Sequence, residues 1–254
     1  MADEVLYEVR DSVAWITLNR PEARNALNKA ARDGVRDAFV RFNGDANAAV
    51  AVLTGAGDKA FCAGGDLKEM SDTSLKIPPR DHMVYLGRTL KVDKPVIAAI
   101  NGLAYAGGFL LAQQVDLVVA ADHARFAITE AKVGRGSPWA APLSWLMPPR
   151  VAMEMLMTGD PISAQRAYEL GLVNKVVPAE DLVAETQKLA SAIAGNAPLS
   201  VQAAKAMLYA SAEMGWTAAL DTGDRIYERV YLSEDGQEGP RAFKEKRKPV
   251  WQGK

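Results

Sequence analysis

Hydrophobic residues fall into two kinds of run along this chain. Short, continuous apolar stretches rich in small and β-branched residues are typical of buried strands, and they occur at 12–18, 48–55, 94–102, 116–121 and 124–128. Between the first two stretches, residues 24–45 carry Leu27, Val35 and Phe39 at broadly helical spacing and predict an amphipathic helix. Strands that alternate with helices in this way predict an α/β fold with a mostly parallel sheet covered on both faces.

The pattern changes near Asn196, where strand signals stop. The patterns of residues 197–214 and 217–232 predict helices. We therefore predict a core domain over 1–195 and a C-terminal helical segment over 196–254, packed against the core or a neighbouring subunit. Earlier in the chain, residues 71–87 lack periodicity and contain two adjacent prolines, so we expect a mobile loop that lines the mouth of a site.

The amino-acid composition limits the kinds of molecule and environment that suit this protein. The 254 residues include 30 basic and 31 acidic side chains, which argues against a general attraction to nucleic acid or an anionic membrane. Cys62 stands alone, so no intrachain disulfide can form. The N-terminus lacks an apolar signal region, and the uncharged stretch Pro95–Val115 contains Asn101 and three glycines, unlike a membrane span. We expect a cytoplasmic, soluble protein.

The first candidate for chemistry is the turn at residues 63–65, which follows an apolar run and carries almost no side chain. Asp66, followed three residues later by Glu69, fits a capping box and predicts a helix from Leu67. Free backbone amides would then converge where a ligand can approach closely. Taken alone, the stretch is better explained by a simple tight turn that needs small residues.

A second stretch of the same kind changes that balance. Asn101 and Gly102 make a turn after a strand, and Gly107 and Gly108 then open an apolar helix. The N-terminus of a helix presents unpaired N–H groups that favour an anion. Two such turns in one domain can hold a single oxyanion, as forms when a carbonyl becomes an enolate.

Other reaction classes find little support in the sequence. A dinucleotide-binding fingerprint would need glycine where Ala60 stands, and neither a P-loop nor a G-x-S-x-G elbow is present. His82 and His123 show no metal-ligand spacing with Cys62, so we expect no metal. A nucleophilic pair of Cys62 and His82 stays open, with a buried structural cysteine as the default.

Taken together, several segments resemble the crotonase family, also called enoyl-CoA hydratase/isomerase. They follow the family's order along almost the whole chain, at 17–27, 60–70, 100–112, 171–178 and 243–251. The resemblance implies a spiral of ββα units with a C-terminal helical trimerisation segment. It also implies a homotrimer or a hexamer built as a dimer of trimers. The implied substrate is an acyl-CoA thioester, with no cofactor because CoA is part of the substrate.

Site roles follow from the resemblance position by position. The backbone amides of Ala63 and Gly107 match the family's oxyanion hole, and Glu130 matches a catalytic carboxylate. Residues that match the substrate-binding positions, with Arg24 near the CoA phosphates and Lys246 as a C-terminal cationic contact, are Arg24, Gly64, Asp66, Gly108, Trp139 and Lys246.

The expected reaction depends on how many catalytic carboxylates the site contains. Family hydratases use two carboxylates, and the position of the first is Leu110 here. Pro138, which lacks an N–H, stands near the amide that helps to hold the attacking water, and Trp139 adds bulk. A single acid, Glu130, suits isomerisation of a 3-enoyl-CoA to a 2-enoyl-CoA through a dienolate.

Two alternatives remain. Hydration of a 2-enoyl-CoA becomes possible if Glu69, Asp81 or His82 supplies a second acid. The chain could also be a non-catalytic family member that binds acyl-CoA or RNA, although the balanced charge argues against nucleic acid.

Overall fold

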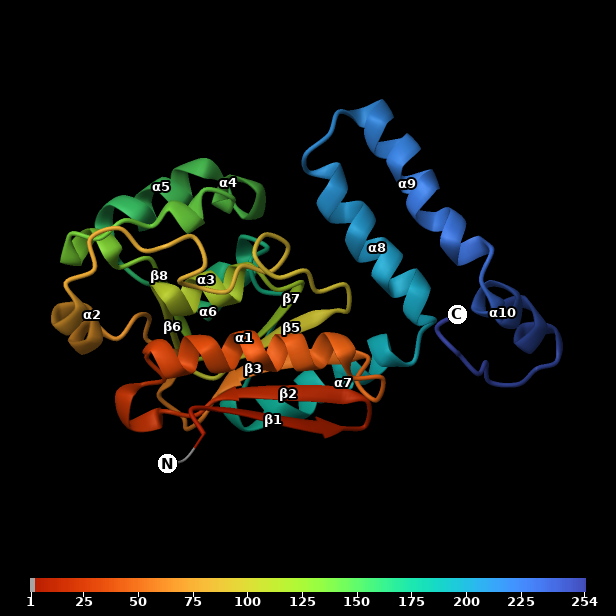
Figure 1. The fold of residues 1–254 in the computed structure, drawn as a ribbon, viewed down its shortest axis with the longest axis horizontal. Helices are drawn as coiled ribbons and strands as arrows, with labels where there is room; N and C mark the ends of the chain where they lie inside the picture. The colour runs from red at the N-terminus through yellow and green to blue at the C-terminus, as the bar shows by residue number, and fades with distance from the viewer. Residues whose placement is uncertain (1–2) are drawn as a thin grey trace.

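Two sheets carry the strands of residues 3–254, the part of the chain that the computed structural model describes (Figure 1). The larger sheet is parallel apart from its first pair and has the order β1 (Val5–Arg10), β2 (Val13–Leu18), β3 (Val50–Gly55), β5 (Val96–Ile100), β7 (Leu117–Ala121), β10 (Lys175–Val177). The smaller sheet is parallel apart from its last pair and has the order β4 (Ala60–Cys62), β6 (Leu103–Tyr105), β8 (Arg125–Ala127), β9 (Ile162–Ser163).

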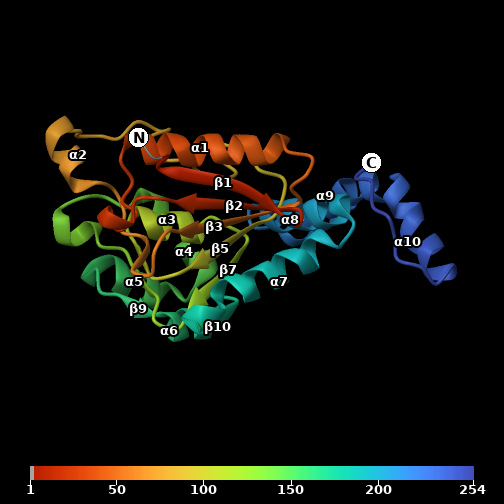
Figure 2. The same cartoon turned by 90° about the horizontal axis from the view of Figure 1, so that it is seen from below.

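Helices pack around these sheets, and the C-terminal helices extend away from them. They are α1 (Lys29–Gly44), α2 (Leu67–Thr73), α3 (Gly107–Gln113), α4 (Leu143–Leu146), α5 (Pro149–Thr158), α6 (Ala164–Glu169), α7 (Leu182–Ala194), α8 (Pro198–Ser211), α9 (Trp216–Tyr231) and α10 (Glu234–Lys244). Short 3₁₀ turns are η1 (Pro21–Ala23), η2 (Glu130–Val133), η3 (Pro138–Ala140) and η4 (Ala179–Asp181). Figure 2 shows α1 on one side of the larger sheet and α7 on the other.

Burial on both faces explains the continuous apolar strands. In β2, Ala14 and Ile16 join the core under α1, whereas Val13 and Trp15 join the cluster under α7. Successive side chains of a strand point to opposite faces, so every position is buried in a strand that is covered on both sides. Each position then favours an apolar residue. The predicted α/β fold with ββα units is confirmed, as are the strands predicted from apolar runs.

The helix predicted over 24–45 is shorter at its start than expected. It begins at Lys29 because the Asn28 side chain accepts a hydrogen bond from the Ala31 N–H and caps it. Leu27 precedes the helix and pairs with Gly65 in an isolated bridge. Likewise, the stretch 71–87 is irregular only after α2 ends at Thr73. Its mobility stays a prediction.

The C-terminal helices extend away from the two sheets. Figure 1 shows α8 and α9 as an adjacent antiparallel pair, with α10 at the end of the molecule opposite α2. An ion pair of 2.8 Å between Lys205 of α8 and Asp116 holds this segment to the core. The domain boundary after residue 195 stays a prediction. Among residues 3–254, no helix is both long and apolar enough to cross a membrane.

Candidate active site

The smaller sheet brings three distant segments to one edge. Strands β4, β6 and β8 run parallel, with Cys62 beside Ala104 and Tyr105 beside Ala127. The carboxyl ends of parallel strands meet at the same edge, where ligands commonly bind. Two to three residues beyond these ends lie Gly65, Gly107 and Glu130, so the topology gathers both glycine turns and the candidate acid.

The oxyanion prediction needs one correction in the turn after β4. The Ala63 N–H donates to the carbonyl of Arg24 at 3.0 Å, so it is not free to bind a ligand. Gly64 has a φ of +103°, which glycine tolerates, and its carbonyl accepts a 2.8 Å bond from the Leu27 N–H. Both bonds hold the turn against the segment before α1. Ala63 is therefore the wrong residue for an oxyanion donor.

The amide of Gly65 is free instead. Within residues 3–254, neither the Gly65 N–H nor the Gly107 N–H donates to a protein acceptor. A Cβ built on Gly107 would lie 3.6 Å from the Gly65 nitrogen, so the two turns are in contact. We take Gly65 and Gly107 as the candidate oxyanion donors. Gly65 directly precedes the Asp66 cap of α2, and this position is the sequence signal that could have identified it.

Close packing requires the second glycine of α3. A Cβ on Gly108 would lie 2.1 Å from the Cys62 carbonyl oxygen. Ala106, just before the helix, has the unusual combination φ 50° and ψ −117°, and its N–H is held by the Ala127 carbonyl at 2.9 Å. Strained backbone of this kind persists where surrounding contacts over-determine it, often at functional sites. Gly108 thus sets how closely α3 approaches the turn after β4.

Asp66 caps α2, as the sequence predicts, but the reciprocal half of the capping box is absent. Its Oδ1 accepts from the N–H groups of Lys68 and Glu69, and its Oδ2 pairs with Arg20 at 3.1 Å. The Glu69 carboxylate turns to α1, where it accepts from the Lys29 N–H at 2.6 Å. Both oxygens of Asp66 are thus engaged within the protein. Its predicted substrate contact stays a prediction.

Replacement of Asp66 by alanine should lower the free energy of unfolding by about 1 kcal/mol, the usual contribution of an N-cap. Asp66→Asn keeps an acceptor and should cost less. Burial opposes ionisation of this carboxyl, but Arg20 and the two amides outweigh it and hold the pKa below its usual range. That stabilisation is present above the ordinary aspartate pKa of about 3.9 and disappears as the pH falls through the lowered folded value. Urea unfolding should therefore show a difference between wild type and Asp66→Ala that shrinks in acid; a difference that grows there would contradict the assignment.

Glu130 is the buried carboxyl of this edge. It opens η2, is 9% exposed, and its Oε2 has no hydrogen-bond partner among the described residues. Burial raises the pKa of Glu130, opposed by its own amide and by the Trp139 side chain. Trp139 also packs against Phe109 of α3, with ring centroids 6.1 Å apart. A carboxyl with a raised pKa in an apolar setting suits general acid–base chemistry.

Among residues 3–254, no candidate for a second acid is a free, buried carboxyl. Leu110 lies in α3, 2% exposed. Glu69 is paired with Arg32 at 2.6 Å, and Asp81 is exposed. Burial, assisted by Arg32, lowers the pKa of half-buried His82. None of Glu69, Asp81 and His82 is therefore an unpaired, buried acid.

The proposed cysteine nucleophile also fails. Cys62 is fully buried, and burial raises the pKa of its thiol to about 12. A thiol with such a pKa carries no useful thiolate at neutral pH. Cys62 is a core residue, as its default interpretation holds.

The remaining predicted contacts are dispersed. Arg24 is exposed beside the turn after β4, since its carbonyl binds the Ala63 amide. Pro138 opens η3 and Trp139 follows, so both lie near Glu130 in the fold. Lys246 comes after α10, at the far end of the molecule from α2 (Figures 1 and 2). Within one chain the structure therefore does not bring Lys246 to the strand edge.

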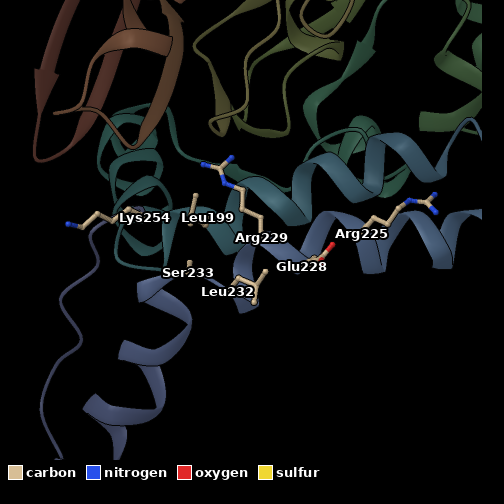
Figure 3. Close-up of a pocket in the computed structure, with 7 residues that line it drawn as sticks. All are labelled: Leu199, Arg225, Glu228, Arg229, Leu232, Ser233 and Lys254. Atoms are coloured by element: carbon tan, nitrogen blue, oxygen red, sulfur yellow. The ribbon is translucent and has the colours of Figure 1, made fainter.

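An open groove of about 530 Å³ lies elsewhere, beside α9 and the start of α8 (Figure 3). Residues of α8, of α9, of the link between α9 and α10 and of the C-terminus line it: Leu199, Arg225, Glu228, Arg229, Leu232, Ser233 and Lys254. It contains none of the groups gathered at the strand edge. We place the candidate active site at the edge and not in this groove, because only the edge combines free amides with a buried carboxyl.

The chain is similar to a known protein family and to characterised relatives. The family model described as enoyl-CoA hydratase/isomerase matches residues 8–254. A carnitinyl-CoA dehydratase of Proteus mirabilis is 39% identical over 262 residues, covering 100% of both chains. A carnitinyl-CoA dehydratase of Salmonella typhi is 40% identical over 247 residues, covering 94% of each.

Solved structures give the same picture. A probable enoyl-CoA hydratase/isomerase from Mycobacterium abscessus superposes with a TM-score of 0.89 at 40% identity, with 100% of both chains covered. Enoyl-CoA hydratase EchA1 from Mycobacterium marinum superposes with a TM-score of 0.92 at 38% identity, covering 99% of this chain and 100% of that one.

Proposed function

This chain belongs to the enoyl-CoA hydratase/isomerase (crotonase) family, and from that premise we propose that it moves a proton at C2 of an acyl-CoA thioester. Family members typically need no cofactor. One observation carries the proposal: the free amides of Gly65 and Gly107 lie at the same strand edge as buried Glu130.

In this mechanism the thioester oxygen accepts hydrogen bonds from both amides. Ionised Glu130 removes a proton from C2, and the carbonyl oxygen gains charge as the enolate forms. Fixed donors act most strongly on charge that develops in a site shielded from water. Burial raises the pKa of Glu130 and so makes it a stronger base once ionised.

The reaction that we propose is reversible elimination of water from a 3-hydroxyacyl-CoA. The names of the relatives, carnitinyl-CoA dehydratase and enoyl-CoA hydratase, support this better than isomerisation. A single acid can balance the step: Glu130 takes the C2 proton, and the C3–O bond breaks. The same proton then leaves with the hydroxyl as water, and hydration is the reverse.

Isomerisation of a 3-enoyl-CoA is the second candidate, and Leu110 is the observation that favours it. A buried leucine stands where family hydratases are expected to carry their first carboxylate. Glu130 would then remove the C2 proton and return it at C4, with no water involved.

The test is mass spectrometry of thioesters after incubation with the purified protein. The panel holds 3-hydroxyacyl-, 2-enoyl- and 3-enoyl-CoA of matched chain length. Hydratase activity predicts that the 2-enoyl substrate gains the mass of one water. Conversion of 3-enoyl to 2-enoyl without a mass change would instead favour the isomerase. No conversion despite measurable CoA-thioester binding would leave the non-catalytic alternative.

We also propose that the C-terminal helices assemble the protein into a homotrimer or a dimer of trimers. Large apolar side chains are exposed along them, at Leu208, Tyr209, Trp216, Leu220, Tyr231, Leu232 and Phe243. Exposed apolar surface of this extent marks an association face. In such an assembly Lys246 would meet a neighbouring chain, which is how it could approach a site it does not reach alone.

A double replacement of Trp216 and Leu220 by glutamate should dissociate the assembly. These residues lie one helical turn apart on α9 and are 83% and 57% exposed. Two charges on one face cannot be buried without a large desolvation penalty. Sedimentation of wild type should give three or six times the chain mass of 27.3 kDa, and the variant should give a smaller species. A monomeric wild type would contradict the proposal.

A further inference from the structure

The C-terminal helices α8, α9 and α10 form an arm, residues 198–254, that extends away from the two sheets (Figure 1). Leu199 and Ala203 of α8 are buried with Val230 of α9 in a small apolar cluster. This cluster is separate from the two apolar clusters of the core. The arm therefore has an apolar core of its own and does not need the sheets to hold α8 against α9.

The end of the chain joins α10 to the start of α8. Asp235 of α10 is buried, and its carboxylate accepts hydrogen bonds from the N–H groups of Gln252 and Gly253 at 2.7 and 2.8 Å. A Cβ built on Gly253 would lie 3.5 Å from the ring of Pro198, the first residue of α8. The three helices and the chain end thus form one body.

Two side chains on one face of α8 attach this body to the core. Lys205 Nζ donates to Asp116 Oδ2 at 2.8 Å and to the Lys94 carbonyl at 2.9 Å. One helical turn later, the Tyr209 hydroxyl donates to Asp116 Oδ1 at 3.0 Å. In the part of the chain that the structure describes, no other hydrogen bond joins the arm to residues before the linker 195–197. The hydrogen-bonded attachment is therefore narrow and centred on Asp116.

The core holds Asp116 firmly in place. Its N–H donates to the Val96 carbonyl at 2.9 Å, and its Oδ2 accepts from the Val96 N–H at 2.7 Å. Lys94 is fixed as well, because its Nζ donates at 2.7–2.9 Å to the carbonyls of Phe42, Asp45 and Ala48. The side chains of Lys205 and Asp116 are only 15% and 16% exposed, so salt screens this ion pair less than a pair on the open surface.

The linker 195–197 is the only covalent connection between the core and the arm. Gly195 and Asn196 are exposed, and their N–H groups bond only to carbonyls of the last turn of α7. Trp251 of the arm donates to the Gly195 carbonyl at 2.9 Å, so the arm also contacts the linker itself. A rotation here would break the bonds to Asp116 but leave every apolar cluster intact. Hydrogen bonds exchange with water at modest net cost, whereas exposure of an apolar cluster is unfavourable in proportion to its area.

We propose that Asp116 is the latch of a hinged arm. The arm turns as one body about the linker 195–197, and the bonds from Lys205 and Tyr209 hold it at one angle to the core. The inference goes beyond the proposed chemistry and does not depend on it. The Tyr209 side chain, 52% exposed, also belongs to the surface proposed above for assembly. The latch then sets the angle at which that surface meets a second copy.

Two spin labels measure the angle of the arm directly. Asp37→Cys and Glu213→Cys place them at exposed positions on α1 and just after α8, whereas Cys62 is fully buried and stays unlabelled. Labelled chains are mixed with an excess of unlabelled chains before assembly, so that only distances within one chain are measured. Wild type should give one narrow distance. Lys205→Met should raise the share of displaced arms by about 10- to 100-fold, the contribution of a hydrogen bond to a charged group. Lys205→Arg keeps the charge and should keep the narrow distance.

A double mutant tests whether the attachment acts through Asp116. Tyr209→Phe removes one hydroxyl and should broaden the distance distribution in the wild-type background but add nothing in an Asp116→Ala background. Asp93→Asn is the matched control, because Asp93 is exposed and pairs with Lys91 instead of the arm. It should leave the distribution unchanged. Equal broadening by Tyr209→Phe in both backgrounds, or a folded Lys205→Met protein with the wild-type distribution, would overturn the proposal.

Hydrogen exchange separates release of the arm from a general loss of stability. Lys205→Met should speed the exchange of the Gly195 and Asn196 amides, while the amides of β5 and β7 exchange as in wild type. Uniform acceleration, or no change at the linker, would contradict a hinge at this place. Neither measurement uses a thioester, so a latched arm in a protein that turns over no acyl-CoA would refute the proposed function alone. A broad distance distribution in an active wild type would refute the latch alone.

Discussion

Replacement of Glu130 by glutamine is expected to reduce turnover of every acyl-CoA substrate by about 10²–10⁴-fold, the usual contribution of a general acid–base group. Glutamine has the same shape but can neither accept the C2 proton nor return it. The substitution also removes a buried ionisable group, whose folded pKa is raised by burial. For such an acid, stability falls as the pH rises from the ordinary value through the raised one. At neutral pH the variant should therefore be at least as stable as wild type.

Steady-state kinetics and thermal unfolding check this expectation together. Asp81→Asn is the matched control, because it removes an exposed carboxylate of the adjoining loop and should leave turnover within about twofold, as for surface changes remote from a site. Near-wild-type turnover in Glu130→Gln would assign the chemistry to another acid. A loss in Asp81→Asn would identify the second acid that a two-carboxylate hydratase needs.

The second large effect is expected from Gly108→Ala. The new Cβ would lie 2.1 Å from the Cys62 carbonyl oxygen, a distance that real side chains do not tolerate. The start of α3 must therefore move away from β4 and carry the Gly107 amide with it. Loss of one oxyanion donor reduces kcat by about 10²–10³-fold, or about 2.7–4 kcal/mol of barrier. Overpacking should also lower the free energy of unfolding by about 1–3 kcal/mol.

Gly44→Ala provides the comparison, since a Cβ there meets nothing within 4 Å. It should change neither kcat nor stability by a measurable amount, apart from the small helix-propensity gain of alanine. The informative quantity is the ratio of kcat values for the two variants at a temperature where both are folded. A Gly108→Ala enzyme with normal kcat would mean that the Gly107 amide does not bind the developing oxyanion.

Apolar patterning was sufficient to predict the long elements of the core. Strands β2, β3, β5 and β7 are buried on both faces, so each one appears in the sequence as a continuous apolar run. Strands β4 and β6 span only three residues each, too few for any periodicity to appear. Their existence depends on pairing with residues that are distant in sequence.

Helix α10 shows the opposite difficulty. It contains Pro240 and two glycines, which disfavour a helix locally. Its stability comes from tertiary bonds, including Asp235 to the N–H groups of Gln252 and Gly253. These contacts join residues that are distant in sequence, so they cannot be predicted from local helix propensity.

Some residues of the candidate site could likewise be predicted from the sequence, and others could not. Resemblance to a family suggests Gly107 from the segment 100–112, and Glu130 from its position just after the strand predicted at 124–128. The error at Ala63 arises from a hydrogen bond to Arg24, which depends on how a distant turn packs.

Exchange of the C2 hydrogen in deuterated water tests the proposed enolate chemistry without any other step. A saturated acyl-CoA has no double bond to hydrate or move, so any exchange reports enolate formation alone. We predict that wild type incorporates deuterium at C2, that Glu130→Gln abolishes the exchange, and that Gly108→Ala slows it. Undiminished exchange in Glu130→Gln, or no exchange by wild type with any thioester it binds, would contradict the proposed mechanism.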